Sequence, residues 1–428
     1  MDTIFAQATA AGRAGVSVVR ISGPDAFNIA GKMVGSLPAT HQTALRLVKD
    51  ADDSVVDQAL VLSFEGPNSF TGEDVVEFQL HGSIAVMQTV LRRLSEFPSA
   101  RLAEAGEFTR RALENGKLDL AQVEGLADLI EAETESQRKQ ALRVFSGHLG
   151  KTVDGWRADL IRAAALLEAT IDFADEDVPV DVTPEVSNLL AGVAREMKSE
   201  VAGSKIAERI RSGFEVAIIG APNAGKSTLL NALAGRDAAI TSEIAGTTRD
   251  VVEVRMHLAG LPVTLLDTAG LRESDDVVEA IGIERAVQRA VAADLRIFLM
   301  QDDDTLPLEP SGDDIVVHPK ADLYPDVDGA VSGHTGAGLS TLIGRVTEVL
   351  KHRSSAVGVA THERHRSAML RALSGIEVVE TILSHGADEY DIAAEELRST
   401  VQALEVVVGR IGVENLLDEI FLSFCIGK

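Results

Sequence analysis

The sequence contains a single cysteine, Cys425, which excludes an internal disulfide framework and a zinc site built on cysteines. No stretch reaches 18 uninterrupted apolar residues, and the N-terminus lacks a basic region followed by an apolar core. Neither membrane insertion nor export is therefore expected, and the predicted location is the cytoplasm.

Positive charge is scarce relative to negative charge. Lysine and arginine number 40 against 66 aspartates and glutamates, which gives a formal net charge of −26. Because nucleic-acid binding depends on neutralising phosphates with lysine and arginine, this balance works against non-specific attraction to RNA. If RNA is a substrate, a partner should hold much of it. The acidic runs at 172–181 and 302–304 are interpreted as solvated loops rather than metal sites.

The strongest motif is Gly-Ala-Pro-Asn-Ala-Gly-Lys-Ser at residues 220–227, which matches the pattern G-x-x-x-x-G-K-[ST]. An apolar run precedes it and a helical pattern follows it, as the strand, loop and helix of a phosphate-binding loop require. The glycines let successive backbone N–H groups face one anion. Lys226 adds a positive charge, and the Ser227 hydroxyl can ligate Mg²⁺. The motif predicts a triphosphate site.

Two further segments have the spacing of a nucleotide-operated switch. Thr247-Thr248 follow the loop, and Asp267-Thr268-Ala269-Gly270 close a second apolar run. Asp267 is expected at a strand end near the metal, and the Gly270 N–H can approach a γ-phosphate. The next residue, Leu271, is apolar, so the water-orienting glutamine of Ras-like proteins is absent. Another group must position the water.

Length and composition are ordinary for a soluble protein of about two to four domains, with 428 residues of which 45% are hydrophobic and 25% charged. Residues 1 to about 115 combine strand-like segments with a helical stretch, which predicts an α+β domain. Helical periodicity marks residues 119–171, a further helix that follows a break at 172–184 and runs to about 210, and the stretches 361–385, 391–408 and 413–424. We predict a multidomain α/β and α+β protein in which the nucleotide domain, a parallel-rich sheet with flanking helices, is inserted into a helical domain.

Several blocks of sequence match one family. They are TIFAQAT at 3–9, RISG at 20–23, GPNSFTGED at 66–74, AGEFT at 105–109, KLDLAQ at 117–122 and FCIGK at 424–428. With the nucleotide motifs, they make the chain resemble the MnmE (TrmE) family of tRNA-modifying GTPases over nearly its whole length. The resemblance implies a folate-binding and dimerising domain at 1–116, a helical domain from 117–210 and 355–428 that ends in a folate-binding or catalytic tail, and a Ras-like P-loop GTPase domain at 211–354.

The resemblance also implies a reaction. Members work in a heterotetramer with the FAD-containing partner MnmG (GidA) and add an aminomethyl or carboxymethylaminomethyl group to C5 of the wobble uridine in tRNA. The carbon comes from a 5-formyl or methylene tetrahydrofolate. The implied folate contacts are Arg20, Glu77, Lys117 and Lys428. Without the family, Arg20 and Glu77 would be read as solvent-facing side chains of β segments.

For the GTPase domain the resemblance implies a set of nucleotide and cation contacts. Mg²⁺ would be held by Ser227 and Thr248, and K⁺ by Asn223, Ser242, Ile244 and Thr247. The implied GTP contacts are Asn223, Ala224, Gly225, Lys226, Ser227, Thr228, Ser242, Thr247, Thr248, Asp267, Thr268, Ala269, Gly270, Lys320, Asp322 and Ser332. A monovalent cation beside the phosphates can neutralise transition-state charge where other GTPases use an arginine finger.

The implied catalytic residues are Glu279, Lys226 and Cys425. Glu279 would act on the attacking water through a second water, although from the residues alone it would be a solvated carboxylate. Cys425 is either a core thiol at a helix end or, by resemblance, a residue near the modification centre. A third interpretation, a prenylation box, is disfavoured because Gly427 is not aliphatic and Lys428 is a poor final residue.

The base side of the nucleotide site departs from the family. Residues 319–322 are Pro-Lys-Ala-Asp where Asn-Lys-x-Asp is expected. Asp322 can still accept hydrogen bonds from guanine and Lys320 can cover the base, but the amide that contacts the base and braces the phosphate loop is lost, a deficit of about 1 kcal/mol. Residues 332–334 are Ser-Gly-His instead of Ser-Ala-Lys or Ser-Ala-Arg, and 301–314 shows no crossover helix. We predict GTP hydrolysis with weakened guanine binding.

Three alternatives remain open on sequence grounds. A regulatory or ribosome-assembly GTPase switch shares the phosphate motifs but has no reason to carry folate blocks or the ending at 425–428. A folate-dependent enzyme acting on small molecules would not need a GTPase. ATP in place of GTP is kept open by Pro319.

Overall fold

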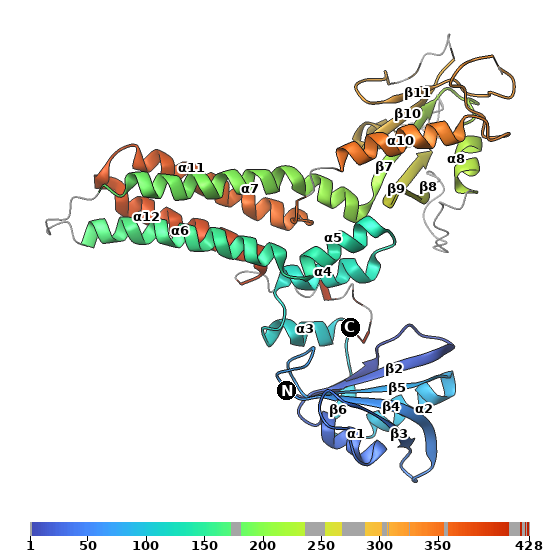
Figure 1. Ribbon diagram of the computed structural model, residues 1–428, viewed down its shortest axis with the longest axis vertical. Coiled ribbons are helices and arrows are strands. Elements are labelled where there is room, and N and C mark those ends of the chain that lie inside the picture. The colour runs from blue at the N-terminus through green and yellow to red at the C-terminus, as the bar shows by residue number, and fades with distance from the viewer. Residues whose placement is uncertain are drawn as a thin grey trace, which may run out of the picture. The chain divides into compact units, whose positions relative to one another are not determined.

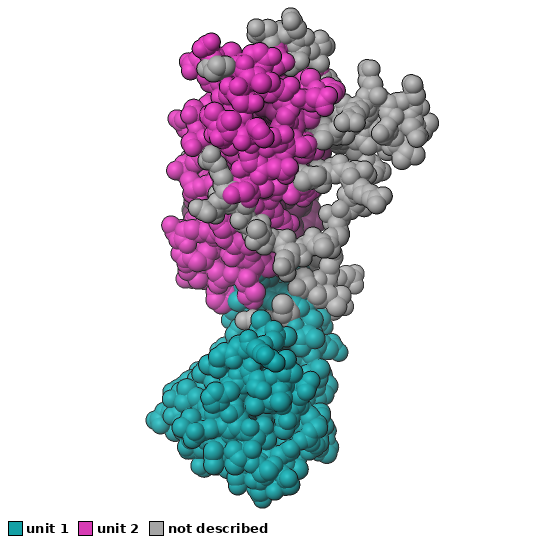
Figure 2. All heavy atoms as spheres, turned by 90° about the vertical axis from the view of Figure 1, so that its right-hand side faces the viewer, with its two compact units in different colours: residues 1–127, 405–428 teal, residues 128–404 magenta. Residues whose placement is uncertain are grey.

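The computed structural model describes residues 2–172, 181–235, 253–267, 287–301, 306, 308–324, 326–354, 358–410, 420–421, 424 and 426–427. It divides into two compact units, which are coloured separately in Figure 2: residues 1–127 with 405–428, and residues 128–404. None of the described helices is both long enough and apolar enough to span a bilayer.

The first unit is built on a six-stranded sheet of order β3-β4-β5-β2-β1-β6. Its strands are β1 (Thr3–Gln7), β2 (Ala14–Ser22), β3 (Thr43–Lys49), β4 (Val55–Phe64), β5 (Val75–Gly82) and β6 (Ala100–Leu102). Alternate residues such as Val19, Ile21 and Phe78 form one apolar face. Helices α1 (Ala26–Val34) and α2 (Ile84–Ser95) pack on that face, so the predicted α+β domain is confirmed.

The opposite face of this sheet carries a smaller core. Ile4 and Ala6 of β1 pack there with Ala103 and with Phe108 of α3 (Glu107–Glu114). Residues close to the end of the chain belong to the same unit, since Phe421 and Phe424 pack with Val123, and Ile426 forms an antiparallel bridge with Ala105.

Three long helices dominate the described part of the second unit and lie side by side in Figure 1: α6 (His148–Asp172), α7 (Thr183–Ser212) and α11 (Glu363–Leu383). The shorter α5 (Glu135–Phe145) contacts α6 and α7, and the short η1 (Ala387–Glu389) contacts α11. Two more helices, α4 (Leu120–Glu131) and α12 (Tyr390–Val408), each contain residues of both units. The fully buried Leu160 and Leu167 of α6 belong to the apolar helical face seen in the sequence. The bundle thus draws on segments on both sides of the nucleotide motifs.

The second unit also contains a five-stranded sheet of order β11-β10-β7-β9-β8. The strands are β7 (Phe214–Gly220), β8 (Glu253–Leu258), β9 (Leu261–Asp267), β10 (Leu295–Leu299) and β11 (Ile315–Val317), all parallel to their neighbours except β8. Helices α8 (Lys226–Ala234) and α10 (Leu339–Arg353) share a core with it. The predicted parallel-rich sheet is confirmed.

The connection from β10 to β11 has no helix among its described residues, in agreement with the sequence. Leu306 and Leu308 pack instead against Ile219 and Phe298. Two apolar side chains of the loop thus cover part of the sheet face that a crossover helix would normally cover.

Candidate functional site

The phosphate motif forms the turn between the central strand β7 and helix α8. Gly225 has φ of 98° and Asn223 has φ of 61°, so both are left-handed and the loop folds back on itself. The ammonium of Lys226, which is 7% exposed, donates to the carbonyls of Gly220 at 2.8 Å and Ala221 at 3.0 Å. The lysine thereby spans the loop at the N-terminus of α8, where helix N–H groups favour an anion.

Ser227 and Asp267 meet beside this loop. The Ser227 hydroxyl donates to Asp267 Oδ2 at 2.7 Å. Asp267 ends β9, lies next to Ile218 in register and is 3% exposed. Its second oxygen, Oδ1, is buried and has no hydrogen-bond partner among the described residues. Because a hydroxyl and a carboxylate with spare acceptor capacity suit Mg²⁺, the donor set fits the ion expected from the sequence.

A cavity of about 350 Å³ lies on the base side of the phosphate loop. Several residues that the sequence predicts as GTP contacts line it: Asn223, Ala224, Gly225, Thr228, Lys320, Asp322 and Ser332. Pro319 and His334 line it as well. Asp322 Oδ1 accepts a hydrogen bond from the Ser332 hydroxyl at 2.5 Å. This bond stabilises the charged carboxylate and so holds the pKa of Asp322 below its ordinary value.

Part of the predicted site lies outside the described residues: Ser242, Ile244, Thr247, Thr248, Thr268, Ala269, Gly270, Glu279, Cys425 and Lys428. The roles assigned to them stay predictions.

The first unit holds a second group of predicted residues. Arg20 of β2 and Glu77 of β5 face each other in register, with Arg20 Nε 2.8 Å from Glu77 Oε1 and both side chains 18% exposed. The guanidinium carbon of Arg20 lies 5.3 Å from the ring centre of Phe70 and 5.6 Å from that of Phe108. These distances allow cation–π attraction. The ion pair therefore borders the smaller core, on the face opposite α1 and α2.

Lys117 approaches the same site through the loop at 66–74. Its ammonium donates to the Pro67 carbonyl at 2.8 Å, and Asn115 donates to the Thr71 carbonyl at 2.7 Å. Phe70 of this loop contacts Arg20, so one loop brings Arg20, Glu77 and Lys117 together. Sequence reasoning missed Phe70 and Phe108 as site residues, although both stand in the blocks GPNSFTGED and AGEFT.

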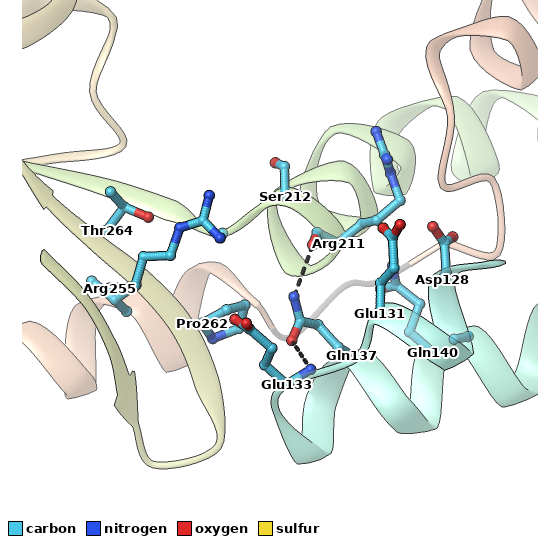
Figure 3. Close-up of a pocket in the computed structure, with 13 residues that line it drawn as sticks. Asp128, Glu131, Glu133, Gln137, Gln140, Arg211, Ser212, Arg255, Pro262 and Thr264 are labelled. Atoms are coloured by element: carbon cyan, nitrogen blue, oxygen red, sulfur yellow. Dashed lines mark hydrogen bonds between the residues drawn. The ribbon is translucent and has the colours of Figure 1, made fainter. Parts of the chain in front are cut away.

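A larger cavity, of about 530 Å³, contains none of the predicted site residues. Figure 3 shows its walls: the turn between α4 and α5 with Glu131 and Glu133, the end of α7 with Arg211, and the strand residues Arg255 and Thr264. Gln137 connects two of these walls, because its amide donates to the Arg211 carbonyl at 2.9 Å and accepts from the Glu133 N–H at 3.1 Å. No motif in the sequence marked this cavity.

A mostly parallel sheet, a glycine loop that leads into a helix, and a serine that hydrogen-bonds a buried aspartate define a P-loop nucleotide-binding protein. The family model described as "GTP-binding protein TrmE N-terminus" matches residues 3–117, and that of the MnmE helical domain matches 120–425. The tRNA modification GTPase MnmE of Roseobacter denitrificans is 65% identical and that of Ruegeria pomeroyi 62% identical, each over 100% of both chains. The chain belongs to the MnmE family of tRNA modification GTPases.

The chain is also similar to parts of two solved structures. A variant of Era from Aquifex aeolicus bound to GDP.AlF4- is 26% identical, with 38% of this chain and 66% of that chain covered and a TM-score of 0.24. The G domain of T. maritima FeoB is 23% identical, with coverage of 32% and 97% and a TM-score of 0.24. Because these TM-scores are low, the assignment as a GTPase rests on the sequence relatives.

Proposed function

We propose that this GTPase is the GTP-hydrolysing subunit of a complex that, with the FAD-containing partner MnmG, adds an aminomethyl or carboxymethylaminomethyl group to C5 of the wobble uridine in tRNA. A tetrahydrofolate derivative supplies the carbon. The observation that carries the proposal is the presence of two chemically different sites on one chain. These are the phosphate loop with Ser227 and Asp267, and the group formed by Arg20, Glu77 and Lys117.

The second group suits a folate. A pterin ring presents N–H donors beside ring nitrogens, which a carboxylate and a guanidinium can recognise together, and Phe70 offers an adjacent aromatic surface. The glutamate tail of a folate is anionic, so the ammonium of Lys117 suits it. Lys428 and Cys425 complete the proposed site.

Binding of GTP requires the Lys226 ammonium to change its hydrogen-bond partners. Its ammonium, now bonded to carbonyls of its own loop, would bond to phosphate oxygens when GTP binds. Ser227 and Thr248 would hold Mg²⁺, and Asn223, Ser242, Ile244 and Thr247 would hold K⁺. When bound, these cations neutralise charge on the phosphates. Glu279 would orient the attacking water.

The apolar outer face of the first sheet supports a homodimer. Leu45 and Leu60 lie opposite each other on β3 and β4 and are 56% and 36% exposed. The neighbouring row runs from Leu62 to Glu77 and on to Arg20, so a second copy seated here would adjoin the proposed folate site. Sedimentation of Leu45→Arg should show monomers, and an unchanged dimer would place the interface elsewhere.

The deciding experiment is mass spectrometry of wobble nucleosides in tRNA from cells that lack the protein. Complementation with the native chain should restore C5 modification, whereas Lys226→Ala and Glu77→Gln should not. Glu77→Gln should retain GTP hydrolysis, because its site is separate from the nucleotide site. Lys49→Ala, which alters an exposed lysine of β3, is the control. Unchanged modification in the deletion strain would contradict the proposal and favour a regulatory GTPase switch.

A further inference from the structure

At Gly333, in the loop at 331–338, the backbone lies so close to helix α8 that a side chain at this position would force the two backbones apart. A Cβ atom at Gly333 would lie 2.6 Å from both the carbonyl carbon and the carbonyl oxygen of Thr228, and 2.7 Å from the Leu229 nitrogen. These are backbone atoms of the first turns of α8, which cannot move aside as a flexible side chain can. Gly333 is outside the left-handed region, so space rather than φ is what disfavours the alanine of the usual Ser-Ala-Lys motif at this position of this chain.

This contact is linked directly to the residue expected to bind guanine. Ser332, the neighbour of Gly333, is 2% exposed. Its hydroxyl donates to Asp322 Oδ1 at 2.5 Å and accepts from the N–H groups of His334 and Thr335, each at 3.2 Å. A displacement of Gly333 would therefore move Ser332 and, with it, the Asp322 carboxylate.

The segment that carries Pro319 is joined to the same loop. Pro319 and Val331 form a parallel bridge, the Val331 N–H donates to the His318 carbonyl at 2.8 Å, and the Ala321 N–H donates to the Val331 carbonyl at 3.0 Å. The two base-side segments thus form one hydrogen-bonded body. In the usual motif an asparagine at position 319 would brace this body against the phosphate loop, and proline has no side-chain amide with which to do so.

We propose that Gly333 is a positioning residue for guanine recognition, because its contact with the Thr228 backbone sets the distance between Asp322 and the phosphate cradle. The contact takes over the bracing that is lost with asparagine at position 319. The inference rests on guanine nucleotide binding in the cavity between these loops.

The test is a thermodynamic cycle between positions 333 and 319, with GDP affinity measured by calorimetry on the full chain. Gly333→Ala should weaken GDP binding by about tenfold or more, since an extra methyl group in a closed contact forces the two backbones apart. Pro319→Asn should restore most of that loss. In the native chain, Pro319→Asn should raise GDP affinity by a smaller factor than it does in Gly333→Ala, because Gly333 already supplies the brace. Gly344→Ala is the matched control, because a Cβ there meets nothing within 4 Å.

A second readout separates positioning from general destabilisation. Asp322 is expected to bond the 2-amino group of guanine, which inosine diphosphate (IDP) lacks. Gly333→Ala should therefore reduce the preference for GDP over IDP. In GTP hydrolysis, the same variant should change KM more than it changes kcat at saturating GTP. The proposal would be overturned if Gly333→Ala reduced GDP affinity equally in the native chain and in Pro319→Asn. It would also be overturned if Gly333→Ala left the ratio of GDP affinity to IDP affinity unchanged. Failure of the native chain to bind GDP would overturn the nucleotide site itself.

Discussion

Arg111 is a charged residue in a nearly closed environment, with 6% of its side chain exposed. It bonds the carboxylates of Glu73 and Glu107, both at 3.1 Å, and the carbonyl and carboxylate of Asp2. Arg111→Met would leave Glu73 and Glu107 buried without this partner, so we expect the first unit to lose about 3–5 kcal/mol of unfolding free energy. Hydrogen exchange of the β2 and β5 amides measures this loss. Arg92→Met, at a side chain that is 51% exposed, should cost less than about 1 kcal/mol, and equal losses would contradict the argument.

The same network gives the first unit a predicted acid sensitivity. Burial alone would raise the pKa of Glu107, but hydrogen bonds from Arg101, the Glu104 N–H and Arg111 outweigh it and hold the pKa below the ordinary 4.5. A carboxylate with a lowered pKa stabilises the folded state above pH 4.5, and this stabilisation is lost as the pH falls further. Exchange rates of the native chain should therefore rise more steeply below about pH 4.5 than those of Arg111→Met, which has lost part of the network. Parallel pH profiles would exclude this role for Glu107.

The residues of the phosphate site were predictable from the sequence. They either lie together in one motif or stand at the end of a strand that pairs in parallel with the strand before the motif. Lys226 and Ser227 follow from one motif, and Asp267 follows because parallel strands end at the same edge. The surroundings of Arg20 were not predictable. Phe70 and Phe108 reach it from loops and helices far along the chain, and nothing in local periodicity encodes such a contact.

At the scale of elements, hydrogen bonds connect the start of α5 to the hairpin formed by β8 and β9. The Ser136 N–H and hydroxyl both donate to the Gly260 carbonyl, at 3.2 Å and 2.6 Å. Ser136→Ala removes one of these bonds, worth about 1 kcal/mol, so amides of the hairpin should exchange up to about fivefold faster. Ser146→Ala is the control, because among the described residues the Ser146 hydroxyl bonds the Arg143 carbonyl of its own helix alone, and hairpin exchange should not respond. Equal exchange in both variants would show that α5 does not restrain the hairpin.

The turn of this hairpin explains why sequence reasoning identified β9 but not its partner. Ala259 and Gly260 both have positive φ, at 51° and 86°, as a two-residue hairpin turn requires. Asparagine or aspartate would normally mark the first of these positions, and alanine gives no such signal. The lack of a helix among the described residues of the crossover at 301–314 was easier to predict, since Pro307 and Pro310 disfavour a helix there.

At the scale of the whole molecule, residues from both ends of the chain lie in one unit. Gly427 has φ of 101°, and a Cβ atom there would lie 2.2 Å from the Gln7 carbonyl oxygen at the end of β1. The close approach of Gly427 to β1, together with the bridge between Ile426 and Ala105, holds a short tail at residues 426–427 against the first unit. A sequence motif can mark such a tail, but only the folded chain shows where it is held.

On the proposed function, Gly427→Ala should abolish wobble modification while GTP hydrolysis continues. The added methyl group would collide with the Gln7 carbonyl and displace the tail, whereas the phosphate loop belongs to the other unit. Nucleoside mass spectrometry and phosphate release measure the two activities on the same variant. Gly12→Ala is the matched control, because Gly12 has a similar φ of 120° but open space around its Cβ position. If Gly12→Ala lost modification equally, backbone strain rather than tail docking would be the cause. If Gly427→Ala kept full modification, the docked position of the tail would not be the one in which it acts.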